Sequence, residues 1–409
     1  MAKEERRQPE LRFKGFTADW EQQKINDVAL INPNTSVPDE FEYVDLESVV
    51  GTEMISYRTI KRIDAPSRAK RLAKIGDVFF QTVRPYQKNN YHFDLQNDNF
   101  VFSTGYAQLR PVGDSYFLFS RLQEDKFVLN VLNMCTGTSY PAINANDLGE
   151  IKIFFPKNLK EEIKIGSFLR NLDLLIALHQ RKLDILKNIK KAFLQHMFPE
   201  KSQEFPKLRF NNFSELWEQR KLGKVSDITK LAGFEFTKYV KYSDRGEIIA
   251  LRGLNVKNGN LILDDVKYID ESDFSKLNRS KLYKNDILFT YVGTVGQLAL
   301  VPQNNKYHLA PNVARIRMNT DIDPVFISQQ MGDSNYYNKV IFPLIATSSQ
   351  PALSMENIRK FLVFLPNLEE QNTISSFFEV LDAIITLHQR KLDSLERLKA
   401  SYLQLLFPQ

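Results

Sequence analysis

The seven residues LHQRKLD occupy positions 178–184 and occur again, letter for letter, at positions 387–393, which is 209 residues further along the chain. An identical string of this length indicates that a piece of structure or of function is used twice. A chain of 409 residues predicts two or three domains, which leaves room for two copies of one unit.

The repeat extends across both halves of the chain. The first half opens with LRFKGFTADWEQQK at 11–24 and the second with LRFNNFSELWEQRK at 208–221, and the only two tryptophans lie in these openings. The distance between copies grows from 197 residues at the openings to 209 at the repeated string, so the second copy holds about a dozen extra residues. The later matched stretches are IGDVFFQTV (75–83) with KNDILFTYV (284–292), SYPAINANDL (139–148) with SQPALSMENI (349–358), and IFFPKNLKEE (153–162) with FLPNLEEQ (364–371).

A long helix is predicted at the end of each copy. Residues 158–198 and 367–407 contain no internal proline, and their apolar residues recur at steps of three and four. This spacing is typical of a helix with a narrow apolar seam, as in a coiled coil. The repeated string lies in mid-helix, with its leucine and histidine positions on the seam, and both helices stop at Phe-Pro. The central seam residues are Leu172, Ile176, His179, Leu183 and Leu186 in the first helix and Leu381, Ile385, His388, Leu392 and Leu395 in the second.

The two helices are expected to pair with each other. At about 1.5 Å per residue each would be roughly 60 Å long, and a helix of that length with one apolar seam needs a partner. Globular region and helix alternate along the chain, which makes antiparallel pairing natural. The globular regions contain short β-like runs, such as DVFFQTV and DILFTYV, between clusters of Gly, Asn, Asp and Pro.

We therefore predict an α+β protein with a pseudo-twofold internal repeat. Two mixed α/β domains are separated by two long helices that pair as an antiparallel coiled coil. The expected boundaries are 1–156 for the first domain, 157–200 for the central helix, 201–366 for the second domain and 367–409 for the C-terminal helix.

Composition restricts the class of protein. Hydrophobic residues make up 43% and charged residues 25%, as in ordinary soluble proteins. No apolar run approaches the roughly 18 residues of a membrane span, and the charged N-terminus MAKEERRQPELRF does not predict a secretory signal. The single cysteine, Cys135, excludes a disulfide framework and favours a cytoplasmic location.

The sequence lacks the motifs of the common catalysts. It contains no GxGxxG, no GxxxxGK[ST], no HExxH and no Asp/Asn-Pro-Pro-aromatic motif of an amino-methyltransferase. The glycines of GTVGQL (293–298) fit neither nucleotide-binding fingerprint and predict a turn. His179 and His388 lack the further ligands of a closed metal site and are expected to be packed seam residues. We therefore expect no catalytic residue and no metal site in this chain.

Basic clusters suggest a polyanionic partner. Residues 58–74 carry seven basic side chains and one acidic side chain, residues 274–284 carry a second cluster, and the net charge is +6. Lys and Arg bind phosphates, and forked Arg and amide groups read base edges, although any one cluster fits a solvated surface equally well. The candidate DNA-binding residues are Arg58, Lys61, Arg68, Lys70, Arg71, Arg84, Tyr86, Lys88 and Tyr140 in the first copy, and Lys276, Arg279, Lys281, Tyr291, Thr294 and Gln350 in the second.

The ordered set of motifs, in duplicate, resembles the specificity subunit of type I restriction–modification enzymes over essentially the whole chain. The resemblance rests on the LRF…F…WE openings, the GDVFF and NDILF strands, the YPAI and QPAL segments, and the LHQRKLD helices. It implies two target-recognition domains, each of which binds one half of a bipartite double-stranded DNA target in the major groove. The helical pair would then act as a ruler for the gap between the halves.

The resemblance also implies partner subunits. Two modification subunits would bring S-adenosylmethionine and methylate adenines, and two restriction subunits would bring ATP and Mg²⁺, so this chain would need no cofactor. The repeated helix would offer two identical docking faces. The alternatives are a non-catalytic coiled-coil scaffold for two protein-binding modules, or a self-contained methyltransferase or nuclease. Sequence-dependent DNA binding would argue against the scaffold, and S-adenosylmethionine binding by the isolated chain would favour the third.

Overall fold

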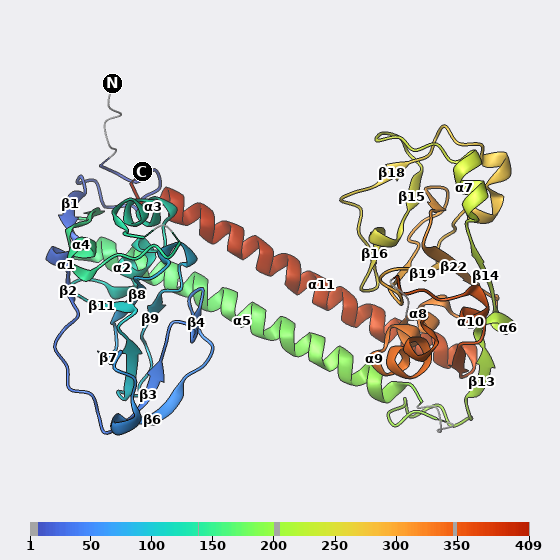
Figure 1. Cartoon of the computed structure of the whole chain (residues 1–409), viewed down its shortest axis with the longest axis horizontal. Coiled ribbons are helices and arrows are strands. Elements are labelled where there is room, and N and C mark those ends of the chain that lie inside the picture. Colours follow the sequence, from blue (N-terminus) through green and yellow to red (C-terminus); the bar gives the residue numbers. More distant parts are fainter. Residues whose placement is uncertain (1–6, 138, 200–204, 347–349, 409) are drawn as a thin grey trace. The chain divides into compact units, whose positions relative to one another are not determined.

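The structure, a computed structural model, describes residues 7–137, 139–199, 205–346 and 350–408 (Figure 1). The chain divides into two compact units, of which unit 1 comprises Met1–Arg181 and Gln389–Gln409, and unit 2 comprises Lys182–His388. Each unit thus joins one globular region to a part of each long helix. Among the described residues, no helix is long and apolar enough to span a membrane.

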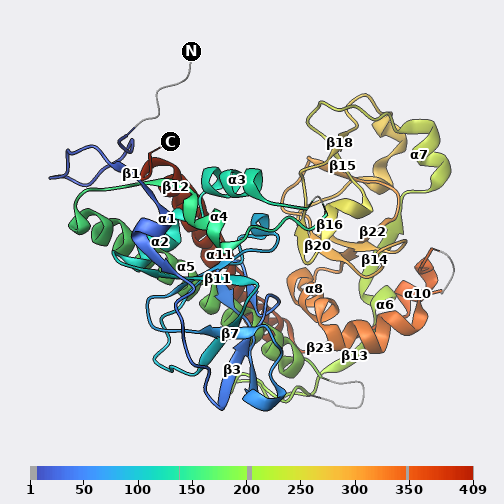
Figure 2. The same ribbon diagram turned by 60° about the vertical axis from the view of Figure 1, so that its left-hand side comes forward.

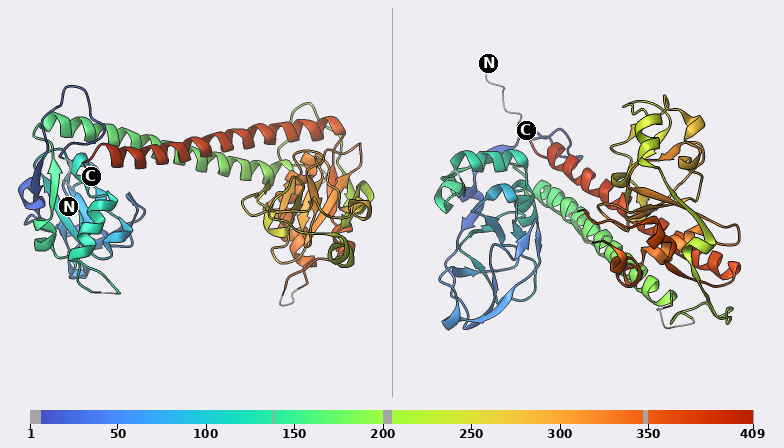
Figure 3. Two further views of the ribbon diagram at one scale, coloured as in Figure 1. Left: turned by 90° about the horizontal axis from the view of Figure 1, so that it is seen from above. Right: turned by 45° about the vertical axis from the view of Figure 1, so that its right-hand side comes forward.

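The two long helices are α5 (Leu159–Met197) and α11 (Leu368–Leu405), which run side by side (Figure 3). In unit 1 the Lys399 ammonium lies 2.6 Å from the Asp173 carboxylate, and in unit 2 the Lys190 ammonium lies 2.6 Å from the Asp382 carboxylate. In both units, therefore, an early residue of one helix contacts a late residue of the other. The predicted antiparallel pairing is confirmed.

All ten central seam positions are buried or half-buried. The leucines that begin the repeated string differ from the expectation, because Leu178 is 62% exposed and Leu387 is 66% exposed. Successive residues of an α-helix point about 100° apart, so a leucine next to a seam histidine faces away from the partner helix. The repeated string therefore contributes both a seam and an exposed apolar face.

Unit 1 contains two four-stranded sheets, of which the second lies farther from α2 and α4 (Figures 1 and 2). The first is antiparallel, and the second includes one parallel pair, β3 with β10. The first sheet has the order β2 (Ala29–Ile31), β11 (Tyr106–Pro111), β8 (Val78–Gln81), β9 (Tyr91–His92), and the second β6 (Arg58–Lys61), β3 (Glu40–Val44), β10 (Phe100–Ser103), β7 (Ala69–Leu72). The smaller elements are β1 (Glu21–Lys24) paired with β12 (Lys152–Phe155), β4 (Val49–Val50) paired with β5 (Glu53–Met54), and helices α1 (Ile25–Val28), α2 (Ser115–Arg121), α3 (Asp125–Met134) and α4 (Ala145–Glu150).

Unit 2 repeats this plan. Its first sheet has the order β14 (Ser226–Lys230), β22 (Val313–Met318), β19 (Ile287–Thr290), β20 (Leu298–Leu300), and its second has β18 (Lys267–Tyr268), β15 (Ile249–Leu251), β21 (Tyr307–Leu309), with β15 and β21 parallel. The smaller elements are β13 (Glu218–Lys221) paired with β23 (Leu362–Leu365), β16 (Val256–Lys257) paired with β17 (Asn260–Leu261), and helices α6 (Leu222–Val225), α7 (Gly233–Tyr239), α8 (Pro324–Gly332), α9 (Ser334–Tyr336) and α10 (Met355–Arg359). Isolated bridges are also repeated, since Val83–Ala142 in unit 1 matches Val292–Ala352 in unit 2. The internal repeat predicted from the sequence is confirmed.

The Phe-Pro end of each long helix enters a hydrophobic core. In unit 1, Phe407 is fully buried against Trp20 and Phe117, at ring-centroid distances of 6.4 and 5.6 Å. In unit 2, Phe198 lies against Trp217, at 6.3 Å. The core of each unit is therefore completed by the tip of the helix that begins in the other globular region.

A buried carboxyl distinguishes the two copies. Glu162, in the first turn of α5, is 8% exposed, and its carboxylate accepts a hydrogen bond from the backbone N–H of Asp114 at 3.2 Å. Burial, and then the nearby Asp114 carboxylate, raise the pKa of Glu162 to about 7. The matched residue in unit 2 is Gln371, whose side-chain oxygen accepts the backbone N–H of Asp323 at 3.0 Å. The second copy keeps the hydrogen bond without the charge.

Glu162→Gln is therefore expected to stabilise unit 1 at pH 8 and to lose this advantage near pH 5. As the pH falls through 7 the folded parent takes up a proton, whereas the unfolded chain does so only near the ordinary pKa of 4.5, so the parent gains stability. The shift sets an upper bound of about 3 kcal/mol, and we expect about 1–2 kcal/mol at pH 8. Urea unfolding in a Trp217→Phe background, followed by Trp20 fluorescence, measures it, with the exposed Glu47→Gln as control. Equal urea midpoints for Glu162→Gln and the parent at pH 8 would contradict a raised pKa of Glu162.

Candidate nucleic-acid interface

In unit 1 the turn between β10 and β11 connects two of the predicted DNA-binding segments, the one at Arg68 and the loop after β8 that carries Arg84. The backbone N–H and hydroxyl of Thr82 donate to the carbonyl of Gly105, at 3.0 and 2.8 Å. The backbone N–H of Thr104, in the same turn, donates to the carbonyl of Arg68 at 2.8 Å. The turn thus lies between Arg68 and the loop that carries Arg84.

The Arg84 side chain lies over an aromatic ring. Its guanidinium carbon is 4.4 Å from the ring centroid of Tyr140, which is 63% exposed. The backbone N–H of Arg84 donates to the carbonyl of Pro141 at 2.8 Å, which holds the two segments together. Two residues predicted separately from sequence therefore form one cationic, aromatic surface feature.

The other residues of this loop are placed differently. Tyr86 is 50% exposed, and its neighbour Pro85 is buried. The Lys88 ammonium donates to the Asp125 carboxylate at 2.6 Å and to the carbonyl of Gln123 at 2.8 Å. Lys88 therefore ties the loop to α3, whereas Tyr86 is exposed and Arg84 is half-buried.

The basic cluster at residues 58–74 is divided between the two edges of the second sheet. Arg58 and Lys61 lie on β6, and Lys70 and Arg71 lie on β7, three strand spacings or about 14 Å away. Arg58 forms an ion pair with Asp45 at 2.9 Å. Arg71 is half-buried, and burial lowers the pKa of its guanidinium. The fold thus brings Arg68 toward Arg84 and separates Arg58 and Lys61 from Lys70 and Arg71.

In unit 2 a hollow of about 390 Å³ occupies the place that corresponds to the Arg84 loop. It brings together two predicted residues, the exposed Thr294 and Gln350. The other residues that line it are Tyr242, Arg252, Gly253, Leu254, Thr290, Val292, Gly293, Pro311 and Asn312. Hydroxyls and amides therefore face a common space, beside the Arg252 guanidinium that the Asp265 carboxylate holds, and hydroxyls and amides are suited to reading base edges.

The remaining predicted residues of unit 2 lie outside this hollow. Lys276 and Arg279 are exposed on short 3₁₀ turns, and the Lys281 ammonium lies 5.4 Å from the ring centroid of Tyr283. Tyr291 is 8% exposed within the core of unit 2, and burial raises the pKa of its hydroxyl. Because its ring is enclosed, Tyr291 supports the loop from inside and is not part of the candidate surface.

Two residues of the candidate interface were missed by sequence reasoning. Thr104 gives no signal in the sequence beyond a short turn motif, Ser-Thr-Gly. Arg252 lies outside both basic clusters, and it donates to the Asp265 carboxylate at 2.9 Å. Both reach the site only because the two sheets pack together, and no spacing pattern in the sequence could have located them.

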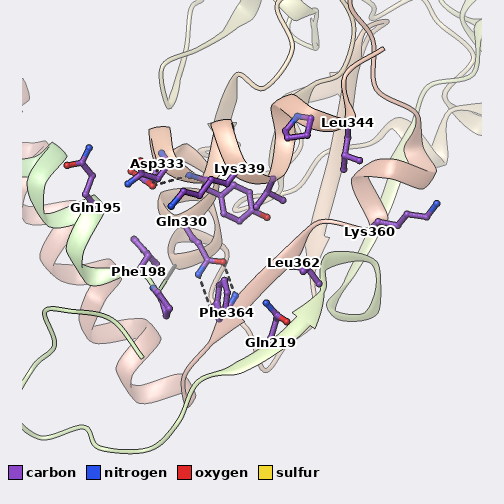
Figure 4. A pocket seen from close by; sticks show the side chains of 15 residues that line it. Gln195, Phe198, Gln219, Gln330, Asp333, Lys339, Leu344, Lys360, Leu362 and Phe364 are labelled. Atoms are coloured by element: carbon purple, nitrogen blue, oxygen red, sulfur yellow. Dashed lines mark hydrogen bonds between the residues drawn. The ribbon is translucent and has the colours of Figure 1, made fainter. Parts of the chain in front are cut away.

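A second hollow in unit 2, of about 240 Å³, has a different character (Figure 4). It lies between the end of α5, β23 and the helical segment 333–344, and it is lined partly by Tyr336, whose buried hydroxyl has no hydrogen-bond partner among the described residues. At the matched positions unit 1 has the buried ion pair of Arg121 with Glu124, and Phe127 in place of the tyrosine. The hollow lies between framework elements, and none of the predicted DNA-binding residues lines it.

No group of three or more metal-ligating side chains lies close enough together to hold a metal ion within residues 7–137, 139–199, 205–346 and 350–408. The described surfaces offer cations, amides, hydroxyls and aromatic rings. These are groups that bind and read a polyanion.

A known protein family matches both copies of the repeat. The family model described as the type I restriction modification DNA specificity domain matches residues 17–188 and again residues 214–397. The specificity subunit of the type I restriction enzyme MjaVIII from Methanocaldococcus jannaschii is 24% identical over 310 residues, which cover 73% of this chain and 71% of that protein.

Solved structures agree on the fold. The S subunit of a type I restriction–modification system from M. genitalium matches with a TM-score of 0.65 at 15% identity, covering 98% of this chain and 99% of that one. A chain from a study of complex assembly and conformational transition of the type I R-M system matches with a TM-score of 0.53 at 20% identity, covering 95% and 97%. Since the family model matches both repeats and most of the sequence, the chain belongs to the family of type I restriction–modification DNA specificity subunits.

Proposed function

We propose that this chain selects the DNA sequence on which a type I restriction–modification complex acts, with each globular region reading one half of a split target. The observation that carries this is one framework built twice with different surfaces. Sheet order and bridges repeat, whereas the loop after β8 presents Arg84 over Tyr140 and the loop after β19 borders a polar hollow. Two similar domains with unlike surfaces suit two unlike half-sites.

The paired helices set the gap between the half-sites. Half-sites one helical turn apart are separated by roughly 34 Å along B-DNA, and helices of 38 and 39 residues measure about 57–59 Å. The ion pairs Lys399–Asp173 and Lys190–Asp382 hold the helices in register in their own units. Register fixes the gap, so a helix insertion would change it.

Matched apolar positions on the helices dock two copies of one partner. Leu178 and Leu387 are 62% and 66% exposed, and their neighbours Leu175 and Ile384 are each 38% exposed. Similar apolar surfaces on two repeats suit two identical modification subunits. Those subunits supply S-adenosylmethionine, restriction subunits supply ATP and Mg²⁺, and this chain works without a cofactor or catalysis in the cytoplasm. A chain of the same fold comes from work on complex assembly of the type I R-M system, which supports partner subunits for this chain.

A methylation map tests the proposal. DNA from cells that express this chain with its companion modification subunit should carry methyladenine at one split motif, and DNA from cells without the chain should lack it. Replacing residues 206–366 with those of a relative should change one half of the motif and leave the other half and the gap intact. A map that does not depend on this chain, with an active modification subunit, would reject the proposal and favour a protein-interaction scaffold.

A further inference from the structure

Arg84 occupies a backbone conformation that the second copy assigns to glycine. Its φ and ψ are 55° and 54°, in the left-handed region, and the matched residue of unit 2 is Gly293, with φ of 78°. The backbone around them is the same, since Arg84 N–H donates to Pro141 at 2.8 Å and Gly293 N–H donates to Pro351 at 2.9 Å. The fold requires the turn in both units, but only unit 1 places a side chain there.

A non-glycine residue in the left-handed region is disfavoured, and such residues concentrate at functional sites. Glycine would relieve the strain at position 84, as it does at position 293. Lys88 adopts the same region, with φ of 55°, but its ammonium is bound to Asp125 and Gln123. A structural contact therefore accounts for Lys88, whereas in the part of the chain that the structure describes Arg84 has no buried or charged partner that would account for its side chain.

Tyr140 limits where the Arg84 guanidinium can go. The guanidinium lies over the ring at 4.4 Å, and a cation held on an aromatic face loses rotational freedom before it binds anything. Among the described residues no carboxylate forms an ion pair with Arg84, which is half-buried, and Tyr140 beside it is 63% exposed, so the pair lies at the surface of unit 1. A positioned guanidinium with unused N–H groups matches the O6 and N7 acceptors of guanine, which is the commonest specific contact of arginine in the major groove.

We infer that Arg84, supported by Tyr140, reads a guanine in the half-site of unit 1, and that unit 2 reads no base from the matched position. The inference rests on the proposed function and adds to it a residue, a base and an asymmetry between the copies. Arg84 is the specificity-determining residue, and Tyr140 is a positioning residue that acts through it.

The test compares methylation maps of the full complex carrying parent chain, Arg84→Gly, Arg84→Lys, Tyr140→Phe or Tyr140→Ala. Arg84→Gly introduces the residue that the second copy has at this position, Gly293, and the variant is therefore expected to fold. The unit 1 half-site, identified by the exchange of residues 206–366, should contain a guanine. At that one position, Arg84→Gly and Arg84→Lys should each reduce discrimination against other bases by roughly tenfold or more. Tyr140→Ala should reduce it partly, and Tyr140→Phe should match the parent.

Lys152→Gln, which removes an exposed positive charge from β12 of the same unit, is the charge control and should leave every position unchanged. A unit 1 half-site without guanine would overturn the inference. A contact from Arg84 to a DNA phosphate would also overturn it. In that case Arg84→Lys would resemble the parent, and Arg84→Gly would weaken DNA binding evenly at all sites. The salt dependence of DNA binding by Arg84→Gly would then be lower by about one charge. These results leave the proposed function standing, because the parent still directs a split motif. A parent map that does not depend on the chain would reject both.

Discussion

Replacing Phe407 with alanine is expected to destabilise unit 1 by about 3–5 kcal/mol, the usual range for removing a buried phenylalanine. Phe407 is fully buried, with its ring 5.6 Å from that of Phe117 and with the buried Arg121 guanidinium 4.8 Å from its own ring centroid. Alanine would leave a cavity and would also remove the aromatic face on which a buried cation rests.

The two tryptophans allow each unit to be followed separately. Trp20 lies beside Phe407 in unit 1, and Trp217 lies beside Phe198 in unit 2. In a Trp217→Phe background, urea unfolding by fluorescence reports unit 1, and Phe407→Ala should shift its midpoint strongly. Phe198→Ala should do the same to unit 2 in a Trp20→Phe background. Leu387→Ala, at an exposed position, should stay within about 0.5 kcal/mol. An unchanged Trp20 transition in Phe407→Ala would show that the helix tip is not part of this core.

Replacing Arg209 with methionine is expected to cost unit 2 about 3–5 kcal/mol, because it leaves a buried carboxylate without its partner. The Arg209 guanidinium makes two hydrogen bonds of 2.7 Å to the Glu370 carboxylate, whose side chain is fully buried. The pair joins the opening segment of the repeat to the first turn of α11. The matched pair in unit 1 is Arg12 with Glu161, at 2.6 and 2.9 Å.

A double-mutant cycle isolates the cause. Arg209→Met with Glu370→Leu should recover most of the loss, because a well-packed apolar pair often replaces a buried ion pair without cost. Urea unfolding followed by Trp217 fluorescence gives each corner of the cycle, and Arg12→Met provides the matched measurement in unit 1. Losses that simply add in the double variant would mean that the two side chains are not energetically coupled.

Local sequence patterns were sufficient to predict the two long paired helices. The steps of three and four in residues 158–198 and 367–407 require a helix with one apolar seam, and the duplication of that seam supplied its partner. Both follow from periodicity, which is a property of neighbouring residues. Leu178 and Leu387 escaped this reasoning because an apolar residue beside the seam looks the same in the sequence as one on it, although it points about 100° away.

The candidate interface was only partly accessible from sequence. Charge and residue type identified Arg84, Tyr140, Thr294 and Gln350, but they also selected Tyr291, which the core encloses, and Lys88, which an aspartate engages. Residue type reports what a side chain can do, whereas burial and pairing decide whether it is available to DNA. Thr104 and Arg252 had no signal because they reach the site through contacts between sheets.

The order of residues is enough to predict that one unit is built twice, that each copy ends in a long helix, and that the helices pair. Repetition and periodicity are properties of the order of residues along the chain, so they can be recognised without a structure. Only the tertiary structure decided that each Phe-Pro tip completes a core, that Arg84 shares a left-handed turn with Gly293, and that Tyr140 lies beneath its guanidinium. The contacts among them join residues tens to hundreds of positions apart, and the shared turn is a backbone conformation, so both exist only after the chain has folded and buried its apolar faces.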